Sequence, residues 1–318
     1  MPEELREKYE AVVGGANIDI CGQSYSPLID KDSNPGFVKT SLGGVGRNIA
    51  HNLALLGVHV CFLTALGDDA NAVLLQKSCG QLGMDISRAR VIPGGRTSTY
   101  VFLNGPDGDM ALAVSDMEIC SRITPEYLES NISVLNAAGV LVIDTNIPEE
   151  SIRWLAQNCK VPIFADPVSV TKAAKLLPSL GKLHTLKPNL LEAQFLSGVE
   201  ISCPDDMKRA AYQLLSTGLK RVFISMGADG VFCADQNGMG TVSPYKADVK
   251  NATGAGDAFM AGLVWSYMKG CDSVLSARLA SAASVVAIEG EETINASMSV
   301  KLLLEKAEDC IQETALIL

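Results

Sequence analysis

The sequence of 318 residues contains no apolar run long enough to span a membrane. Its first ten residues, MPEELREKYE, are rich in charge and hold no apolar segment of the kind found in signal peptides. The nine cysteines are odd in number, widely spaced and never arranged as Cys-x-x-Cys, which argues against a disulfide framework and a zinc site. We therefore expect a cytoplasmic protein without a membrane partner.

Positive charge is also scarce, since the formal net charge is -10. This balance argues against nucleic acid as a partner, although a local basic pocket could still hold a phosphate. Hydrophobic residues make up 47% of the chain and charged residues 19%, which is enough for a large core. Long linkers, low-complexity tracts and internal repeats are absent, and the length permits one large α/β domain or two smaller ones.

Short apolar runs alternate with amphipathic segments of helix length, a pattern that predicts βαβ units and a mainly parallel sheet. The expected strands are residues 11–18, 60–66, 140–143, 163–165 and 222–225. The expected helices are residues 46–56, 70–82, 149–158, 190–196, 205–216, 258–268, 274–287 and 299–314.

One region departs from this alternation. Residues 97–103 and 110–114 are strand-like and flank the turn sequence NGPDGD, which predicts a β-hairpin. Residues 38–41 could add a strand beside it. A small antiparallel sheet inserted into an α/β core would suit a lid or a dimerisation surface; an ordinary surface hairpin is the alternative.

The segment NATGAGD, residues 251–257, resembles a phosphate loop but contains no lysine. Gly254, Ala255 and Gly256 have small or no side chains, so their N–H groups could approach an anion closely. The helix that follows would direct the positive end of its dipole to the same place. Asp257 carries the charge that a phosphate repels, and it could instead be a helix N-cap.

A second glycine-rich stretch, GGVGRN, also precedes a predicted helix. Gly43 and Gly44 would admit a ligand, and Asn48 offers both a donor and an acceptor; a glycine-rich turn is the alternative. Asn17 and Asp19 follow the first strand and share one side of the chain, where they could bind neighbouring sugar hydroxyls.

Two further motifs follow later strands. In KPNLLE, Asn189 could begin a helix, and Glu192 could complete a capping box or help to hold Mg²⁺ through water. In SMGADG, the residues Ser225, Gly227 and Gly230 could wrap a nucleotide or form a hairpin turn.

The order and spacing of these motifs resemble the ribokinase-like (PfkB) family of carbohydrate and nucleoside kinases along nearly the whole chain. The resemblance implies a three-layer α/β/α fold with a mainly parallel central sheet. It implies one kinase domain over residues 1–318, with lid segments at about 20–42 and 97–116. It also implies ATP and Mg²⁺ as cofactors, a small sugar or nucleoside substrate, and a homodimer formed through the lid.

The resemblance also assigns roles to the motif residues. Asp257 becomes the general base, kept ionised because the helix N-terminus lowers its pKa, and residues 254–256 become the anion hole. The substrate-binding residues would be Asn17, Asp19, Gly43, Gly44 and Asn48. The nucleotide and metal residues would be Asn189, Glu192, Ser225, Gly227 and Gly230.

The front of the last motif departs from the family pattern. Relatives usually begin it with Asp-Thr, whose aspartate helps to coordinate a monovalent cation, whereas this chain has Asn251-Ala252. Asn251 could still offer an oxygen, so activation by K⁺ is left open.

A narrower set of matches resembles the bacterial pseudouridine kinases within this family. These matches are DSNPG, SDM, DTNI, DPVS and HTLKPN, in addition to GGVGRN. They imply phosphorylation of the ribose 5′-hydroxyl of pseudouridine, with Asp116 and Asn146 as further substrate-binding residues. The region of Asn34 or Asp116 could read the extra ring N–H of the base. Lys172 could reach a phosphate or be a solvated lysine.

Three other functions compete with this assignment. A kinase for ribose, adenosine or fructose would carry the same motifs. A non-catalytic sugar or nucleoside sensor would have no need for Asp257. A dinucleotide-binding protein is excluded because the glycines of GGVGRN do not directly follow the first strand.

Overall fold

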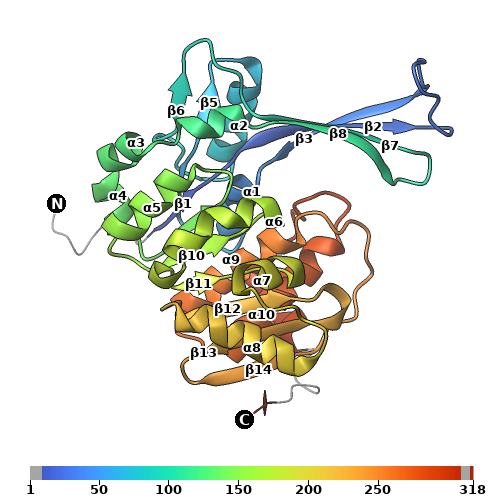
Figure 1. Cartoon of the computed structure of the whole chain (residues 1–318). Helices are drawn as coiled ribbons and strands as arrows, with labels where there is room; N and C mark the ends of the chain where they lie inside the picture. Colours follow the sequence, from blue (N-terminus) through green and yellow to red (C-terminus); the bar gives the residue numbers. More distant parts are fainter. Residues whose placement is uncertain (1–8, 309–315, 318) are drawn as a thin grey trace.

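The computed structural model describes residues 9–308 and 316–317. A layered α/β body carries a second sheet that projects from one side (Figure 1). The central sheet has the strand order β15-β14-β13-β12-β11-β10-β9-β1-β4. Its parallel strands are β1 Glu10–Val13, β4 Val60–Leu63, β9 Leu141–Asp144, β10 Ile163–Asp166, β11 Thr185–Leu186 and β12 Arg221–Ser225. Its antiparallel edge consists of β13 Val231–Asp235, β14 Gly238–Val242 and β15 Leu316–Ile317.

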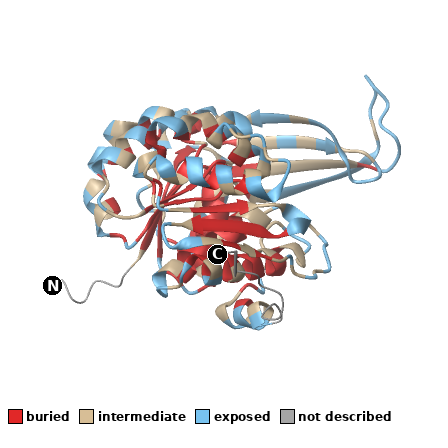
Figure 2. Cartoon of the chain, turned by 60° about the horizontal axis from the view of Figure 1, so that its bottom comes forward, coloured by how far each residue is buried: buried red, intermediate tan, exposed pale blue. Residues whose placement is uncertain are grey.

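Helices cover both faces of this sheet because its parallel strands are apolar on both sides. Val12 and Val142 face one helical layer, whereas Val13 and Ile143 face the other. The first layer contains α1 Val45–Leu55, α2 Ala70–Gln81, α9 Ala255–Met268, α10 Ser273–Ile288 and α11 Val300–Glu308. The second contains α3 Pro125–Ser130, α4 Ile132–Ala137, α5 Glu149–Asn158, α6 Val170–Ala173, α7 Leu190–Ser197 and α8 Pro204–Ser216. Buried residues therefore concentrate in the central sheet and on the helix faces against it (Figure 2).

Shorter elements complete the chain. A two-stranded sheet pairs β5 Ala65–Gly67 with β6 Arg90–Ile92. The 3₁₀ segments are Glu118–Arg122, Ala174–Lys182 and Gly227–Asp229. Within the described ranges, no helix combines the length and apolarity needed to cross a lipid bilayer.

The projecting sheet, called here the outer sheet, has the order β3-β2-β7-β8. Its strands are β2 Asn17–Ser24, β3 Gly36–Gly43, β7 Thr99–Asn104 and β8 Met110–Asp116. The predicted hairpin is confirmed by the antiparallel pairing of β7 with β8. The predicted antiparallel character holds only in part, because β2 runs parallel to β7.

The sequence predicted one strand over residues 11–18, but the chain changes sheets there. β1 ends at Val13, and β2 begins at Asn17 in the outer sheet. A β-carbon on Gly14 would collide with the carboxylate of Asp144, so this crossing needs a glycine. The predicted strand at 60–66 divides similarly into β4 and β5. The end of the predicted 299–314 helix lies outside the described residues.

Candidate active site

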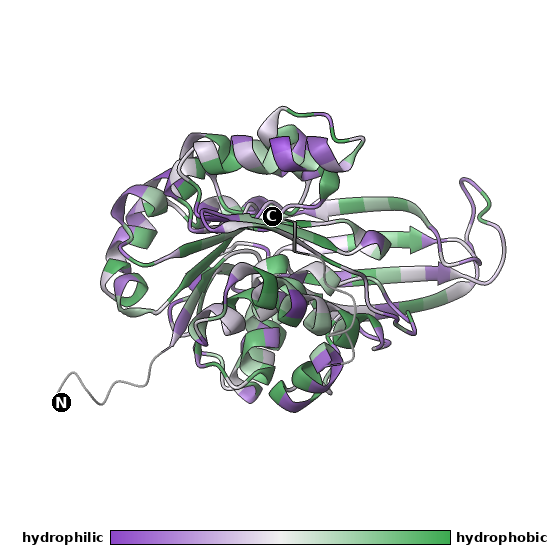
Figure 3. Cartoon of the chain, turned by 90° about the horizontal axis from the view of Figure 1, so that it is seen from below, coloured by the Kyte–Doolittle hydropathy of each residue, from purple (hydrophilic) through white to green (hydrophobic). Residues whose placement is uncertain are grey.

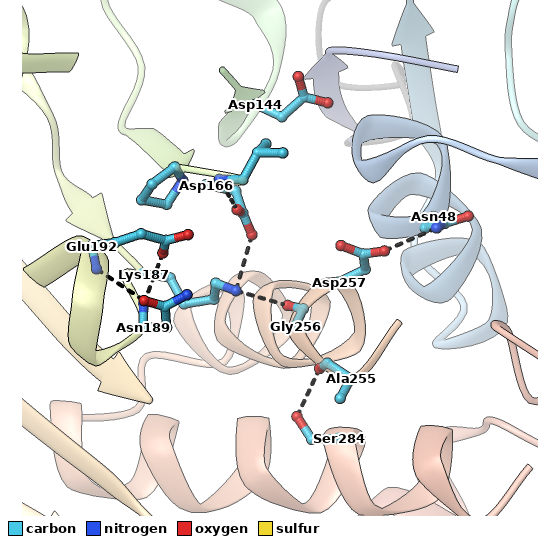
Figure 4. A network of polar contacts seen from close by, with 12 residues as sticks. Asn48, Asp144, Asp166, Lys187, Asn189, Glu192, Ala255, Gly256, Asp257 and Ser284 are labelled. Atoms are coloured by element: carbon cyan, nitrogen blue, oxygen red, sulfur yellow. Dashed lines mark hydrogen bonds and ion pairs between the residues drawn. The ribbon is translucent and has the colours of Figure 1, made fainter. Parts of the chain in front are cut away.

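The candidate site lies where the carboxyl ends of neighbouring parallel strands meet the N-terminus of α9. Strands β9 and β10 end at Asp144 and Asp166, and Lys187 directly follows β11. In a parallel α/β sheet, this edge is where ligands bind. Figure 4 shows these side chains around the first turn of α9, which carries Asp257.

Gly254 is the N-cap of α9 and has a φ of 85°. A β-carbon on this residue would also collide with the carbonyl oxygen of Thr293, so both conformation and space require glycine. The first i→i−4 hydrogen bond of the helix joins the N–H of Ala258 to the oxygen of Gly254, 2.9 Å apart. The amides of Gly256 and Asp257 therefore precede the helical ladder, as expected of an anion-binding helix end.

Asp257 is the third residue of α9, so it is not the N-cap that the sequence allowed as an alternative. Its side chain is 9% exposed, and its Oδ2 accepts a hydrogen bond of 2.9 Å from Nδ2 of Asn48. Figure 4 shows the carboxylate between Asn48 on one side and the Asp166–Lys187 pair on the other.

Burial, and then repulsion from Asp166, raises the pKa of Asp257 to about 7, against the opposing influence of Asn48 and Lys187. The prediction that the helix N-terminus lowers this pKa is wrong. The dipole acts on a group that has lost its water and lies near other carboxylates, and these two effects prevail. Asp257 is therefore a stronger base than expected, and it changes charge near neutral pH.

Lys187 and Asp166 were not among the predicted site residues, yet they form a buried ion pair beside Asp257. Nζ of Lys187 lies 3.0 Å from Oδ2 of Asp166 and donates to the oxygen of Gly256 over 3.4 Å. Burial lowers the pKa of Lys187, but Asp166 together with Asp257 and Glu192 more than offsets it, so the pKa is raised. Lys187 thus supplies positive charge that NATGAGD itself lacks. The sequence signalled only half of this pair, because Asp166 directly follows the predicted strand 163–165, whereas no strand was predicted before Lys187.

The predicted sugar-binding residues come together next to Asn48. Nδ2 of Asn17 donates to Oδ1 of Asp19 over 2.6 Å. A β-carbon on Gly43 would collide with Oδ2 of Asp19, so this glycine lets the carboxylate lie against the backbone. Burial raises the pKa of Asp19, while Asn17 and Arg47 oppose the shift. Gly44, at a φ of 100°, is the N-cap of α1, the helix that carries Asn48.

Asp144, at the end of β9, anchors the segment before β2 and the start of α1 to the central sheet. Its Oδ2 accepts the N–H groups of Gly15 and Gly46 at 2.8 and 2.7 Å, and burial raises its pKa. Two residues on, Oδ1 of Asn146 accepts a hydrogen bond of 2.6 Å from Nζ of Lys172. Lys172 is therefore bonded to a predicted substrate residue, which disagrees with a merely solvated lysine.

The predicted nucleotide residues border a pocket of ≈ 640 Å³ on the other side of the site. Asn189, Ser225 and Gly227 line it together with apolar side chains, including Met226 and Phe232. The turn of SMGADG is also the hairpin that joins β12 to β13. Gly230, at a φ of 90°, lies in this turn, where a β-carbon would collide with the oxygen of Val242.

Asn189 and Glu192 form the predicted capping box of α7. Oδ1 of Asn189 accepts the N–H of Glu192 at 2.9 Å, and Oε2 of Glu192 accepts the N–H of Asn189 at 2.8 Å. Burial raises the pKa of Glu192. Its Oε1 makes no hydrogen bond to the described part of the chain, so one carboxylate oxygen of this largely buried residue remains for a hydrated cation.

Three predicted residues are not brought to this centre. The strand register pairs Tyr100 with Asp19 and Thr99 with Asp116, so Asp116 lies on the opposite face of the outer sheet from Asp19. Its ion-pair partner is Arg96, at 3.3 Å.

The side chains of the other two, Asn34 and Asn251, bind backbone groups of loops. Asn34 exchanges hydrogen bonds with the backbone of Ile29. Asn251 donates from Nδ2 to the oxygen of Glu291 and accepts the N–H of Thr253 on Oδ1. Neither side chain forms a hydrogen bond with Asp257.

The chain is similar to known kinases along nearly its whole length. The model of the pfkB family of carbohydrate kinases matches residues 8–300. Pseudouridine kinase from Escherichia coli (strain K12) is 42% identical over 308 residues, covering 96% of this chain and 98% of that protein. An uncharacterized sugar kinase from the same organism is 34% identical, covering 92% of this chain and 82% of that protein.

Among solved structures, Arabidopsis thaliana ribokinase complexed with ribose and ATP has a TM-score of 0.83. It is 22% identical, and the match covers 95% of this chain and 99% of that one. The predicted ribokinase-like fold is confirmed. Since the family model also spans every motif that forms the site, the chain belongs to the pfkB family of carbohydrate kinases and is an ATP-dependent phosphotransferase with a hydroxyl acceptor.

Proposed function

We propose that the protein is a pseudouridine kinase, which transfers the γ-phosphoryl group of ATP to the ribose 5′-hydroxyl of pseudouridine. The observation that carries the proposal is the buried Asp257 carboxylate, held at the N-terminus of α9 and hydrogen-bonded to Asn48. It lies between the sugar-side residues and the helix end suited to a phosphate. The 42% identity to a pseudouridine kinase over nearly the whole chain favours this substrate within the family.

In this mechanism Asp257 takes the proton of the 5′-hydroxyl as its oxygen attacks the γ-phosphorus. The new O5′–P bond forms while the bond from the γ-phosphorus to the bridging oxygen of ADP breaks, and ADP leaves with that electron pair. Phosphoryl transfer is largely loose, so the proton moves late and positioning matters most. The amides of residues 254–256 and the ammonium of Lys187 stabilise charge on the transferred group.

The sugar is held by Asn17, Asp19 and the backbone at Gly43 and Gly44. An amide and a carboxylate 2.6 Å apart offer a donor and an acceptor to neighbouring hydroxyls. Asn146, held by Lys172, completes this side of the site. The nucleotide lies along Ser225, Gly227 and Gly230, toward the ≈ 640 Å³ pocket.

Mg²⁺ would be held by Glu192 through water, next to Asn189. The unpartnered Oε1 of Glu192 fits this task, since magnesium usually keeps several waters and binds few carboxylates directly. When bound, the ion neutralises charge on the phosphates. Activation by K⁺ has weaker support, because the neutral side chain of Asn251 uses both its oxygen and its nitrogen in hydrogen bonds. Activation by K⁺ is measured by comparing turnover in a buffer that contains K⁺ with turnover in one that contains a bulky organic cation.

We also propose that the outer sheet covers the bound nucleoside and pairs two copies of the chain. Its face away from Asp19 carries Val38, Leu103, Leu112, Val101 and Val114, which are exposed. Hydrophobic residues, coloured green, lie along the projecting strands (Figure 3). Such a face of a projecting sheet is typical of an interaction surface. A second copy of the same sheet offers an equally apolar surface.

The product of the reaction tests the proposed function. Protein, ATP, Mg²⁺ and pseudouridine are incubated, and the product is identified by phosphorus and proton NMR. Pseudouridine 5′-phosphate is expected from the wild type, and Asp257→Asn is expected to lower its rate by about 10²–10⁴-fold. Phosphorylation at another hydroxyl, or none, would contradict the assignment. A kinase for another sugar or nucleoside is the second candidate, since the uncharacterized sugar kinase relative is also similar.

A further inference from the structure

Arg47 is a buried arginine directly behind the acceptor side of the site. It is 4% exposed although it lies in the first turn of α1. Its Nη1 donates to the oxygen of Leu42 over 2.9 Å and to Oδ1 of Asn48 over 3.2 Å. Its Nη2 lies 3.1 Å from Nδ1 of His51 and 3.5 Å from Oγ of Ser78. Burying a guanidinium is costly, so its placement calls for a role beyond solubility.

The donor-only chemistry of Arg47 fixes the orientation of the neighbouring amide. A guanidinium has five N–H donors and no acceptor, so the atom of Asn48 that faces it must be Oδ1. The NH₂ group of Asn48 then points the other way, where Nδ2 lies 2.9 Å from Oδ2 of Asp257. Without Arg47, only the charge of the carboxylate would select this orientation, and a protonated Asp257 could hold the amide turned by 180°, with its oxygen toward the carboxyl group.

The charge of Arg47 also acts on two nearby carboxylates, although it forms no ion pair with either of them. Its positive charge favours the ionised forms of Asp19 and Asp257, which belong to the sugar-binding and phosphate-transfer sides of the site. His51 does not compete, because burial and the neighbouring Arg47 lower its pKa to about 4 and leave the ring neutral. Its Nδ1 therefore accepts from the guanidinium.

We propose that Arg47 is a positioning residue, which holds the amide of Asn48 so that its NH₂ group faces the carboxylate of Asp257. This inference rests on the proposed role of Asp257 as the base. Arg47 touches no reacting atom itself and acts through Asn48. The hydrogen bond to Leu42, at the end of β3, anchors the guanidinium to the outer sheet at the same time.

A double-mutant cycle between Arg47 and Asn48 tests this role. Arg47→Met is expected to lower kcat/KM for the nucleoside by about 10-fold or more, while the KM for ATP stays within about two-fold. In an Asn48→Ala background, the same substitution should have little further effect, because no amide remains to be oriented. Arg47→Lys keeps the charge and a donor, so it should recover part of the loss.

His51→Leu is the matched control, since it removes the partner of the other guanidinium arm and leaves the contact to Asn48. It is expected to keep kcat/KM within about three-fold. Melting temperatures of all variants report folding, and Arg47→Lys replaces Arg47→Met in the cycle if the latter does not fold. Equal losses from the Arg47 substitution in the wild-type and Asn48→Ala backgrounds would overturn the proposal, as would an unchanged kcat/KM.

Failure of the positioning role can be distinguished from failure of the substrate assignment. If pseudouridine is not phosphorylated, the cycle is measured with whichever of uridine, ribose or adenosine the wild type accepts. Coupling between Arg47 and Asn48 would then support the positioning role although the substrate assignment had failed. Additive losses with an active wild type would refute the positioning role and leave the substrate assignment standing.

Discussion

At the scale of single residues, the proposed catalysis depends on a carboxylate that changes its charge near neutral pH. Asp257 is buried, lies near Asp166, and has a pKa raised to about 7. The base must be ionised to accept a proton, so activity is lost as the pH falls through this value. We predict that kcat/KM declines tenfold per pH unit below about pH 7. An acid limb near pH 4 would show that another group, or an unshifted Asp257, controls the rate.

The same pKa has a consequence for stability. Ionised Asp257 is disfavoured in the folded protein, and this unfavourable contribution grows between the ordinary pKa of 3.8 and about 7. Asp257→Asn, whose amide oxygen can still accept from Asn48, should therefore raise the melting temperature at pH 8 and change it little at pH 4. A lower melting temperature at pH 8 would contradict the repulsion inferred here.

The ion pair between Lys187 and Asp166 should be important for folding as well as for charge. Lys187→Met leaves a buried carboxylate without its partner, and we predict a loss of about 3–5 kcal/mol in the free energy of unfolding. Lys208→Met removes an exposed ion pair with Asp205 and should cost less than about 1 kcal/mol. Urea unfolding of both variants measures the difference, and equal losses would contradict the importance of the buried pair.

At the scale of elements, the N-cap of α9 requires a glycine. Gly254 and Gly270 both have positive φ angles, 85° and 74°, but only Gly254 has backbone atoms in the way of a β-carbon. Gly270→Ala should cost about 1–2 kcal/mol, the strain of a left-handed residue. Gly254→Ala should cost more and also lower turnover, because the helix end must shift. Urea unfolding and steady-state assays compare the two; equal effects would argue against a precise helix end.

The sequence predicted the longer helices and the β7–β8 hairpin well, because their apolar spacing is local, but it missed the short helices α3, α4 and α6 and the strands β6, β11, β13 and β14. It predicted a glycine-rich start for the helix that carries Asp257, although it allowed Asp257 itself as the N-cap, and the family resemblance grouped Asn17, Asp19 and Asn48 as sugar-binding residues. It did not predict the passage of the chain from β1 to β2, which depends on Asp144, more than a hundred residues away. The Asp166–Lys187 pair and the raised pKa of Asp257 likewise depend on which strands become neighbours. A charge pair across two strands leaves no periodic trace in either one.

At the scale of the whole molecule, we predict that the apolar face of the outer sheet mediates dimerisation. Val114, on this face, is 63% exposed, and Val73, on α2, is 62% exposed. Val114→Glu should shift the protein from dimer to monomer, because it places a charge in the proposed interface, whereas Val73→Glu should not. Light scattering after gel filtration measures the mass. A monomeric wild type, or a dimer that survives Val114→Glu, would contradict this interface.

Comparing kcat/KM for different acceptors is the best test of whether the protein is a pseudouridine kinase. Initial rates with ATP and Mg²⁺ are measured for pseudouridine, uridine, ribose and adenosine at the same protein concentration. We expect the highest kcat/KM for pseudouridine, and we expect Asp257→Asn to lower turnover while nucleoside binding is retained. A higher kcat/KM for any of the other three acceptors would contradict the claim.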